Sequence, residues 1–188
     1  MAQKARHKTN HMNSKAIENY KRTVKITNRQ KEVIIGTLLG DAHLEENGRK
    51  LYRLKIEHSI KQKEYVEWKF NELKTIAASL PREKLSVREY KGEKRVYKKV
   101  WFNTFSLPGL AFYAGQFYAG GRKCVPKLIK RWITPLAMAV WFMDDGSLKS
   151  NTHKAIIFNT QGFEESDVEL LQQAIQEKYG IASKKRKQ

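Results

Sequence analysis

Two strongly apolar segments stand out along the chain, and each ends in acidic residues. The first spans residues 32–44 and contains Asp41, whereas the second spans residues 136–148 and contains Asp144 and Asp145. The second segment is apolar on all sides, which predicts a buried helix. Carboxylates in the last turn of a helix lie at the negative end of its dipole and need a compensating positive charge. A divalent cation is the usual partner of carboxylate oxygens, so the pattern points to a metal site.

Boundary signals surround both predicted helices. Thr27 and Gln30 have the spacing of a capping box ahead of the first helix. Ahead of the second helix, Thr134 suits the N-cap and Pro135 the first helical position. Gly146 is typical of a C-terminal stop. These signals predict that the acids lie at or just beyond the C-terminal ends of the two helices.

Small residues predict that the two helices pack against each other. Gly36 and Gly40 are four residues apart and share one face of the first helix, and the second helix offers Ala137 and Ala139. Small side chains allow two helix backbones to approach closely. Such packing brings the acids together at one end, and the repeat of one unusual arrangement indicates an internal duplication.

Alternation of apolar and polar positions predicts a sheet between the two helices. Residues 53–57 alternate strictly, as in a half-buried strand. Residues 85–90 and 95–105 flank a Lys-Gly-Glu turn and are typical of a hairpin. Apolar residues at near-helical spacing predict helices over residues 63–78 and 107–118. After the second apolar helix the chain repeats a strand, residues 154–161, and a helix, residues 163–179.

One face of the predicted sheet collects basic, aromatic and amide side chains. Side chains of these types are suited to reading base edges in the major groove of DNA, and a merely solvated face is the alternative. The residues concerned are Arg53, Lys55, Arg88, Tyr90, Arg95, Tyr97, Lys99, Trp101 and Asn103. On the opposite side of the second hairpin strand, Val96, Val100 and Phe102 form an apolar face.

Composition narrows the class of partner. The 188 residues include 37 Lys and Arg against 19 Asp and Glu, a net charge of +18, which favours a polyanion such as nucleic acid. Cys124 is the single cysteine, so no internal disulfide can form, and an intracellular compartment (bacterial cytoplasm or organelle matrix) is expected. The apolar segments are too short to cross a membrane, and the basic N-terminus lacks the apolar core of a secretion signal.

The two apolar segments resemble the paired motifs of LAGLIDADG homing endonucleases, in the monomeric two-motif branch. Ile34–Ala42 and Met138–Gly146 occupy the nine motif positions, and the eighth position, the catalytic acid of the family, is Asp41 or Asp145. The second motif, with Trp-Phe-Met-Asp-Asp-Gly followed by an Asn-Thr-Gln run, is the more specific match. The first motif has alanine in its ninth position, where the family has glycine.

The resemblance implies an α+β fold: a pseudo-twofold pair of αββαββα subdomains with antiparallel, saddle-shaped sheets and the motif helices at the interface. The expected organisation is a flexible basic arm over residues 1–26, a first subdomain over 27–121, a basic linker over 122–133 and a second subdomain over 134–188. The second subdomain is expected to be incomplete, because the hairpin, closing helix and C-terminal lysine of relatives have no counterpart. A fragment or a truncated gene would account for this.

The resemblance also implies a chemistry. It implies Mg²⁺-dependent hydrolysis of double-stranded DNA by a monomer, with Mn²⁺ able to substitute and intron homing as the biological setting. Asp41 and Asp145 are the implied metal ligands, and Lys123 and Gln161 line the catalytic pockets. Lys123 matches the linker lysine of the family, with a basic residue in a charged linker as its alternative. Asp144 is expected to be a neighbour rather than a ligand.

Two other functions remain open on the same residues. An RNA maturase that assists splicing of a host intron uses basic sheets without needing both acids. A catalytically impaired DNA-binding fragment is favoured by the missing C-terminal lysine. Retention of both acids favours the nuclease.

Overall fold

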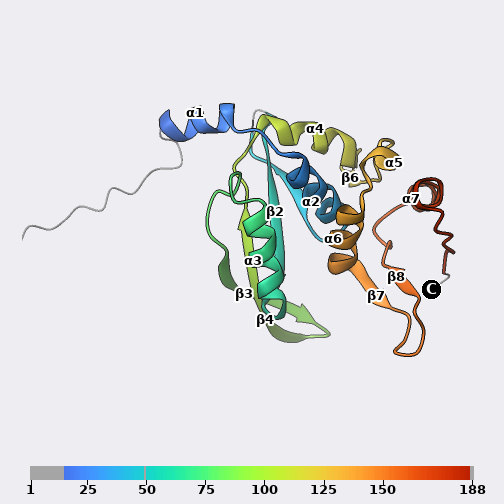
Figure 1. Ribbon diagram of the computed structural model, residues 1–188. Helices are drawn as coiled ribbons and strands as arrows, with labels where there is room; N and C mark the ends of the chain where they lie inside the picture. The colour runs from blue at the N-terminus through green and yellow to red at the C-terminus, as the bar shows by residue number, and fades with distance from the viewer. Residues whose placement is uncertain (1–14, 49, 187–188) are drawn as a thin grey trace, which may run out of the picture.

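A four-stranded antiparallel sheet lies at the centre of the computed structural model, which describes residues 15–48 and 50–186 (Figure 1). The strand order is β1-β2-β4-β3, and the fold is of the α+β class. The strands are β1 (His43–Glu46), β2 (Tyr52–Ser59), β3 (Arg82–Tyr90) and β4 (Glu93–Asn103). The predicted hairpin is confirmed as β3–β4, and its turn residues Lys91 and Gly92 have φ of 52° and 80°. Strand β1 was not anticipated from the sequence.

Helices cover the apolar face of this sheet. They are α2 (Asn28–Leu39), the short 3-10 turn η1 (Ile60–Gln62), α3 (Lys63–Glu72) and α4 (Pro108–Phe117). Leu54 and Ile56 of β2 and Val100 and Phe102 of β4 point toward these helices and are at most 1% exposed. Their burial contributes to the hydrophobic core of the first half of the chain.

Helix α3 is shorter than the periodicity predicted. It ends at Glu72 instead of residue 78, because the following backbone pairs with the end of β4 and the segment after it: Ala78 N–H donates to Asn103 O, and Phe105 N–H donates to Ile76 O. The apolar spacing persists through this turn, since Leu73 and Ile76 are fully buried. The apolar periodicity therefore predicted correctly which residues are buried, but it did not predict where the helix ends.

The apolar face predicted for the hairpin does not extend along its whole length. Val100 is 1% exposed, whereas Val96 is 62% exposed, together with Leu85 and Val87 on the same side. The outer half of the hairpin projects beyond the helices (Figure 1), in agreement with this exposure. The expectation of a continuous buried face is corrected at this point.

The second half of the chain repeats the order helix, strand, strand, helix seen in α2, β1, β2 and α3. Its elements are α6 (Pro135–Asp145), β7 (Gly146–Leu148), β8 (Ile156–Phe158) and α7 (Glu165–Tyr179). Strands β7 and β8 form a separate two-stranded antiparallel sheet. The strand predicted over residues 154–161 is thus shorter, and α7 ends, as predicted, at Gly180 with φ of 67°.

Short elements join the two halves and precede the first. The connection contains β5 (Tyr118–Ala119), β6 (Arg122–Lys123) and α5 (Ile129–Trp132), and α1 (Lys15–Thr23) precedes α2. Part of the expected flexible arm is therefore helical: Tyr20 of α1 donates a hydrogen bond to Thr75 O and its ring packs against Phe105. Residues 1–14 lie outside the described residues. No helix among residues 15–48 and 50–186 is both long and apolar enough to cross a membrane.

The predicted helix caps are confirmed. Thr27 Oγ1 accepts from Gln30 N–H and the Gln30 side chain accepts from Thr27 N–H, which completes a capping box. Thr134 Oγ1 accepts from Ala137 N–H at the start of α6. Gly146 ends α6 with an extended backbone; a Cβ there would lie 2.0 Å from the Phe142 ring, so this glycine is required for space.

Helices α2 and α6 lie side by side at the centre of the molecule (Figure 1). A Cβ at Gly36 would lie 2.5 Å from Ala137 O and 2.7 Å from Val140 Cβ, so the helices pack as closely as the small residues predicted. Two expectations are corrected. Ala139 is exposed, and Val140 takes the contact instead; Met143 is 51% exposed, so α6 is not buried on all sides.

Candidate active site

Two acids lie together where α2 and α6 end. Asp41 follows the C-cap of α2, and Asp145 is the last residue of α6. The Asp41 side chain is 44% exposed, and Asp145 is half-buried. Since the two helices pack along their length and end at the same side, both carboxylates face one region of the surface.

Electrostatics disfavour negative charge at this position. Burial raises the pKa of Asp41, the carboxylate of Asp145 raises it further, and His58 opposes the rise. Burial likewise raises the pKa of Asp145, where Asp144 adds repulsion and Lys123 opposes it. Both acids also lie at the negative ends of helix dipoles. The pair therefore gains from any added cation.

A buried histidine faces the first acid. His58 lies on β2 in phase with core residues, and its side chain is 1% exposed. Nε2 lies 3.0 Å from Lys69 Nζ, and because the ammonium donates, Nε2 accepts and the proton resides on Nδ1. Burial lowers the pKa of His58, and Lys69 lowers it further, which agrees with a neutral ring. Nδ1 lies 3.4 Å from Asp41 Oδ2 but forms no hydrogen bond.

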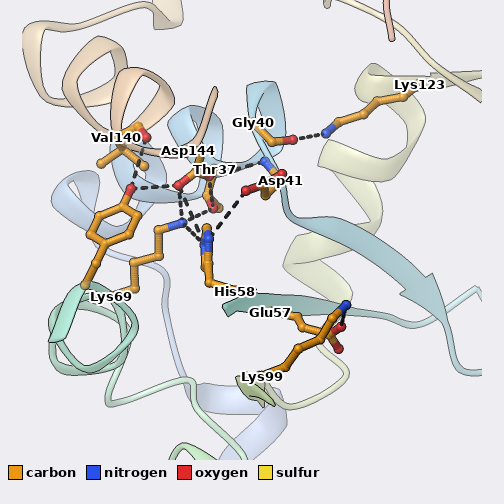
Figure 2. Close-up of polar contacts among 11 residues, drawn as sticks. Thr37, Gly40, Asp41, Glu57, His58, Lys69, Lys99, Lys123, Val140 and Asp144 are labelled. Carbon is orange, nitrogen blue, oxygen red and sulfur yellow. Dashed lines mark hydrogen bonds and ion pairs between the residues drawn. The ribbon is translucent and has the colours of Figure 1, made fainter. Parts of the chain in front are cut away.

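Asp144 is the centre of a buried polar network (Figure 2). Its side chain has no exposed surface. One oxygen accepts from Lys69 Nζ at 2.6 Å and Tyr65 Oη at 2.8 Å; the other accepts from Thr37 Oγ1 at 2.9 Å and Asp41 N–H at 3.3 Å. Asp144 therefore joins α2, α3 and α6 and fixes the backbone of Asp41 from behind.

Sequence reasoning did not single out Lys69, His58 or the network role of Asp144. A signal was present in each case. Lys69 lies three residues after Val66 and four before Leu73, on the buried side of α3, and His58 follows Leu54 and Ile56 in the inward phase of β2. A charged side chain on a buried helical face implies a buried partner of opposite charge.

Lys123 reaches the same region from the connection between the halves (Figure 2). Its Nζ donates to Gly40 O at 2.5 Å and to Ala42 O at 3.1 Å, the carbonyls on either side of Asp41. Burial lowers the pKa of Lys123 to about 8, against the attraction of the three nearby carboxylates. The geometry thus brings the predicted linker lysine beside the acids.

Gln161 does not join this cluster. It is exposed in the turn after β8, and the contacts among the described residues connect it to neither acid. The nearest link is through the backbone, since Asn159 N–H donates to Asp145 O at 2.9 Å. The assignment of Gln161 to a catalytic pocket stays a prediction.

The predicted nucleic-acid face lies on the outer side of the four-stranded sheet. The strand registers place Arg88 opposite Arg95, and Lys55 opposite Asn103. By the alternation of strands, the same face carries the remaining candidates Arg53, Tyr90, Tyr97, Lys99 and Trp101. Figure 2 shows Glu57 and Lys99 on the opposite side of β2 from His58.

Two carboxylates hold basic side chains in place on this face. Glu45 accepts from Arg53 Nε and Lys55 Nζ, both at 2.9 Å. Burial raises the pKa of Glu45, but these bonds outweigh it and leave the pKa at about 2. Glu57 pairs with Lys84 and Lys99, each at 2.6 Å. The face is therefore an ordered array of charges rather than a set of free lysines.

Asp41 and Asp145 fit a hard divalent cation. Their oxygens suit Mg²⁺, and burial together with neighbouring carboxylates raises the pKa of both acids, so a bound cation would favour their ionised forms. Among the described residues, no group of three or more His, Cys, Asp or Glu side chains could hold a metal ion. Mg²⁺ often binds through one or two carboxylates and completes its shell with water and phosphate oxygens.

Comparison with known proteins agrees with this architecture. The sequence profile of the LAGLIDADG DNA endonuclease family matches residues 31–188. DNA endonuclease I-ChuI of Chlamydomonas applanata is 31% identical over 166 residues, which cover 83% of this chain and 75% of that protein. Cytochrome b mRNA maturase bI2 of Saccharomyces cerevisiae is 30% identical over 161 residues, which cover 80% of this chain and 37% of the maturase.

A solved structure shares the fold. The homing endonuclease I-WcaI, bound to its DNA recognition sequence, superimposes with a TM-score of 0.76 at 27% sequence identity, covering 89% of this chain and 75% of that one. Residues 31–188, which match the family profile, contain both apolar segments and the acids that end them. The chain therefore belongs to the LAGLIDADG DNA endonuclease family.

Proposed function

We propose that this protein is a site-specific homing endonuclease that cleaves both strands of DNA with the help of a divalent metal. The observation that carries the proposal is the meeting of Asp41 and Asp145 at the adjacent ends of α2 and α6. Two carboxylates in this arrangement can serve two phosphodiester bonds, one in each strand. The DNA-bound I-WcaI structure, which shares the fold, supports DNA as the partner.

Each residue of the site has a proposed part. Asp41 and Asp145 hold Mg²⁺, for which Mn²⁺ is expected to substitute. When bound there, a divalent metal would supply an activated water and neutralise charge on the phosphate. Lys123, held by Gly40 O and Ala42 O, places an ammonium beside both acids, where negative charge develops on the phosphate. Asp144 and Lys69 fix the Asp41 backbone and do not contact the DNA.

The outer sheet face is proposed to hold the duplex. Its basic side chains match the phosphates, while Tyr97, Trp101 and Asn103 can reach base edges. Glu45 and Glu57 hold neighbouring cations in fixed positions, which lowers the entropy lost on binding. Recognition of a long site follows from a sheet that presents side chains on four strands.

Cleavage of a supercoiled plasmid carrying the uninterrupted insertion locus tests the proposal. We expect linear product in Mg²⁺, binding without cleavage in Ca²⁺, and loss of cleavage in both Asp41→Asn and Asp145→Asn. Glu169→Gln, which removes an exposed carboxylate of α7, is the matched control and should cleave normally. Nicked circles alone would show that one pocket works. Specific binding without cutting in any condition would overturn the nuclease and leave a DNA-binding module.

A second candidate, an RNA maturase that assists intron splicing, is favoured by one observation. The chain is 30% identical to a region of the yeast cytochrome b mRNA maturase bI2. The two functions make separate predictions, because splicing assistance does not require hydrolysis. Rescue of splicing of the host intron in vitro by the Asp41→Asn variant would support the maturase; failure of the wild-type protein to rescue would exclude it.

A further inference from the structure

A cavity of about 590 Å³ lies away from the acids, between α1, the start of α2, α4 and α5. This volume is within the range of about 300–1,000 Å³ that ligand sites occupy. Every charged residue that lines it is basic: Lys21, Arg22, Lys25 and Lys31. Lys21 is paired with Glu18 at 2.7 Å. Within the described part of the chain, the other three cations form no ion pair with an acid.

Three aromatic side chains form a further part of the cavity wall. Phe112, Tyr113 and Trp132 contact one another, with each pair of ring centroids 5.7 Å apart. Tyr113 is buried and anchors the cluster, whereas Phe112 is 53% exposed and offers a ring to a planar ligand. The first turn of α4, at Leu107 to Gly109, also lines the cavity and adds the positive end of its dipole.

This cavity is separate from the proposed duplex-binding face. Helix α4 packs on the helical side of the sheet, where Leu110 and Phe117 are fully buried, and the proposed duplex face is the other side. Figure 1 shows α1 and α4 at one end of the molecule and the tip of the β3–β4 hairpin at the other. A duplex on the outer sheet face would leave the cavity open.

We propose that the cavity binds a single-stranded segment of nucleic acid. Arg22, Lys25 and Lys31 would contact phosphates, and an unstacked base would lie on Phe112 and against Trp132. An inorganic anion would leave the aromatic side chains without a contact, and an apolar ligand would leave three cations without an acidic partner. A duplex keeps its bases stacked, whereas single strands present them to aromatic side chains. The proposal goes beyond DNA cleavage and does not rest on it.

Fluorescence anisotropy with two labelled probes tests the proposal on the full chain. The probes are polyuridine and polythymidine oligonucleotides of about 10 nucleotides, a length within the site sizes of single-strand-binding domains. Phe112→Ala should weaken binding about tenfold, the effect of losing one stacked base. Lys25→Ala should reduce the slope of log affinity against log salt by about 0.7, the value for one phosphate contact on a single strand.

Ile181→Ala is the matched control, because Ile181 follows α7, lines neither the cavity nor the sheet face, and is 54% exposed against 53% for Phe112. It should leave single-strand binding intact, while Phe112→Ala should leave plasmid cleavage or duplex binding intact. Weaker binding of Phe112→Ala to either probe supports the site, and tighter binding of polyuridine identifies RNA as the source. Wild-type affinity of both Phe112→Ala and Lys25→Ala for the two probes, or an equal loss of affinity in Ile181→Ala, would overturn it. Because cleavage is measured separately, failure of this proposal is distinguishable from failure of the nuclease.

Discussion

Lys69 Nζ lies 2.6 Å from Asp144 Oδ1, and neither side chain has any exposed surface. The pair joins α3 to α6 directly behind Asp41, whose amide donates to the second oxygen of Asp144. A C-terminal helical position is unfavourable for a carboxylate, and the ammonium offsets both the dipole and the loss of hydration. Asp144, which was expected to be only a neighbour of Asp145, therefore holds the backbone of Asp41 in position.

Removal of the ammonium should destabilise the protein strongly. Lys69→Met leaves Asp144 buried without its cation, so we expect the free energy of unfolding in urea to fall by about 3–5 kcal/mol. Lys63→Met is the matched control, since Lys63 also lies on α3 and pairs with Glu83 at 2.9 Å, but both side chains are at least half exposed. The control should cost less than about 1 kcal/mol. An equal loss of unfolding free energy in the two variants would contradict the stabilising role of the buried Lys69–Asp144 pair.

The contact between α2 and α6 should tolerate no added methyl group. A Cβ at Gly36 would lie 2.5 Å from Ala137 O, so Gly36→Ala forces the helices apart and should cost about 1–3 kcal/mol of unfolding free energy. Because Asp41 and Asp145 lie at the ends of these helices, the rate of DNA cleavage should fall together with the unfolding free energy.

Gly115→Ala supplies the comparison for that measurement. Gly115 is exposed on α4, and a Cβ there would meet no atom within 4 Å. Alanine is the better helix former, so this variant should gain up to about 1 kcal/mol in the same urea titration. A loss at Gly115 as large as at Gly36 would mean that the effect comes from the backbone and not from helix packing.

The sequence predicts local features of this molecule better than long-range ones. The capping box of Thr27 and Gln30 and the glycines facing α6 depend on neighbouring residues or on one helical face, so their roles could be predicted from spacing. The Lys69–Asp144 pair joins residues 75 positions apart. Alternation and periodicity indicate that Lys69 and His58 point inward, but which partner they meet depends on how α3, β2 and α6 are assembled. The end of α3 was missed for the same reason.

Asp41 and Asp145 should reduce the stability of the metal-free protein. Burial, and then Asp144, raise the pKa of Asp145 in the folded state above its ordinary value. The stability that a raised carboxyl pKa confers is present below the unfolded pKa and is lost as pH rises through the folded pKa. At neutral pH the ionised group therefore opposes folding. Asp145→Asn should have a higher urea midpoint than wild type at pH 7, and the gain should vanish toward pH 4.

Metal addition provides the control for this prediction. Mg²⁺ should raise the urea midpoint of wild type, because it binds the folded state, and should raise that of Asp145→Asn less. Glu169→Gln, on exposed α7, should show neither effect. A midpoint for Asp145→Asn below that of wild type at pH 7 would show that the carboxylate is already compensated within the protein.

Glu57 should restrain non-specific DNA binding. It holds Lys84 and Lys99 at 2.6 Å on the proposed duplex face. Glu57→Gln releases both ammonium groups, so affinity for random-sequence duplex should rise and the salt dependence should steepen by about 0.9 for each added phosphate contact. Both variants are measured by fluorescence anisotropy with a labelled random-sequence duplex. Glu67→Gln makes the same charge change on the exposed side of α3 and should leave the salt dependence of the affinity unchanged. An unchanged slope for Glu57→Gln would place the duplex elsewhere.

Lys123 should make cleavage sensitive to alkaline pH. Burial lowers the pKa of its ammonium to about 8, so the charged form predominates below pH 8 and declines above it. If this charge stabilises the transition state, the cleavage rate at saturating Mg²⁺ should fall above about pH 8. Lys123→Met should lose activity on the order of 100-fold at pH 7. Lys123→Arg, which stays charged, should retain part of its rate without the alkaline decline.

A stability measurement separates this titration from catalysis. Because the folded pKa of about 8 lies below the ordinary value of 10.5, the unfolded chain binds the proton between these pH values and the folded chain does not. The unfolding free energy of wild type should therefore rise relative to Lys123→Met as pH increases from about 8 to 10.5. A difference that stays flat across this range would mean that Lys123 keeps its proton in the fold, and an alkaline loss of cleavage would then have to arise from another group.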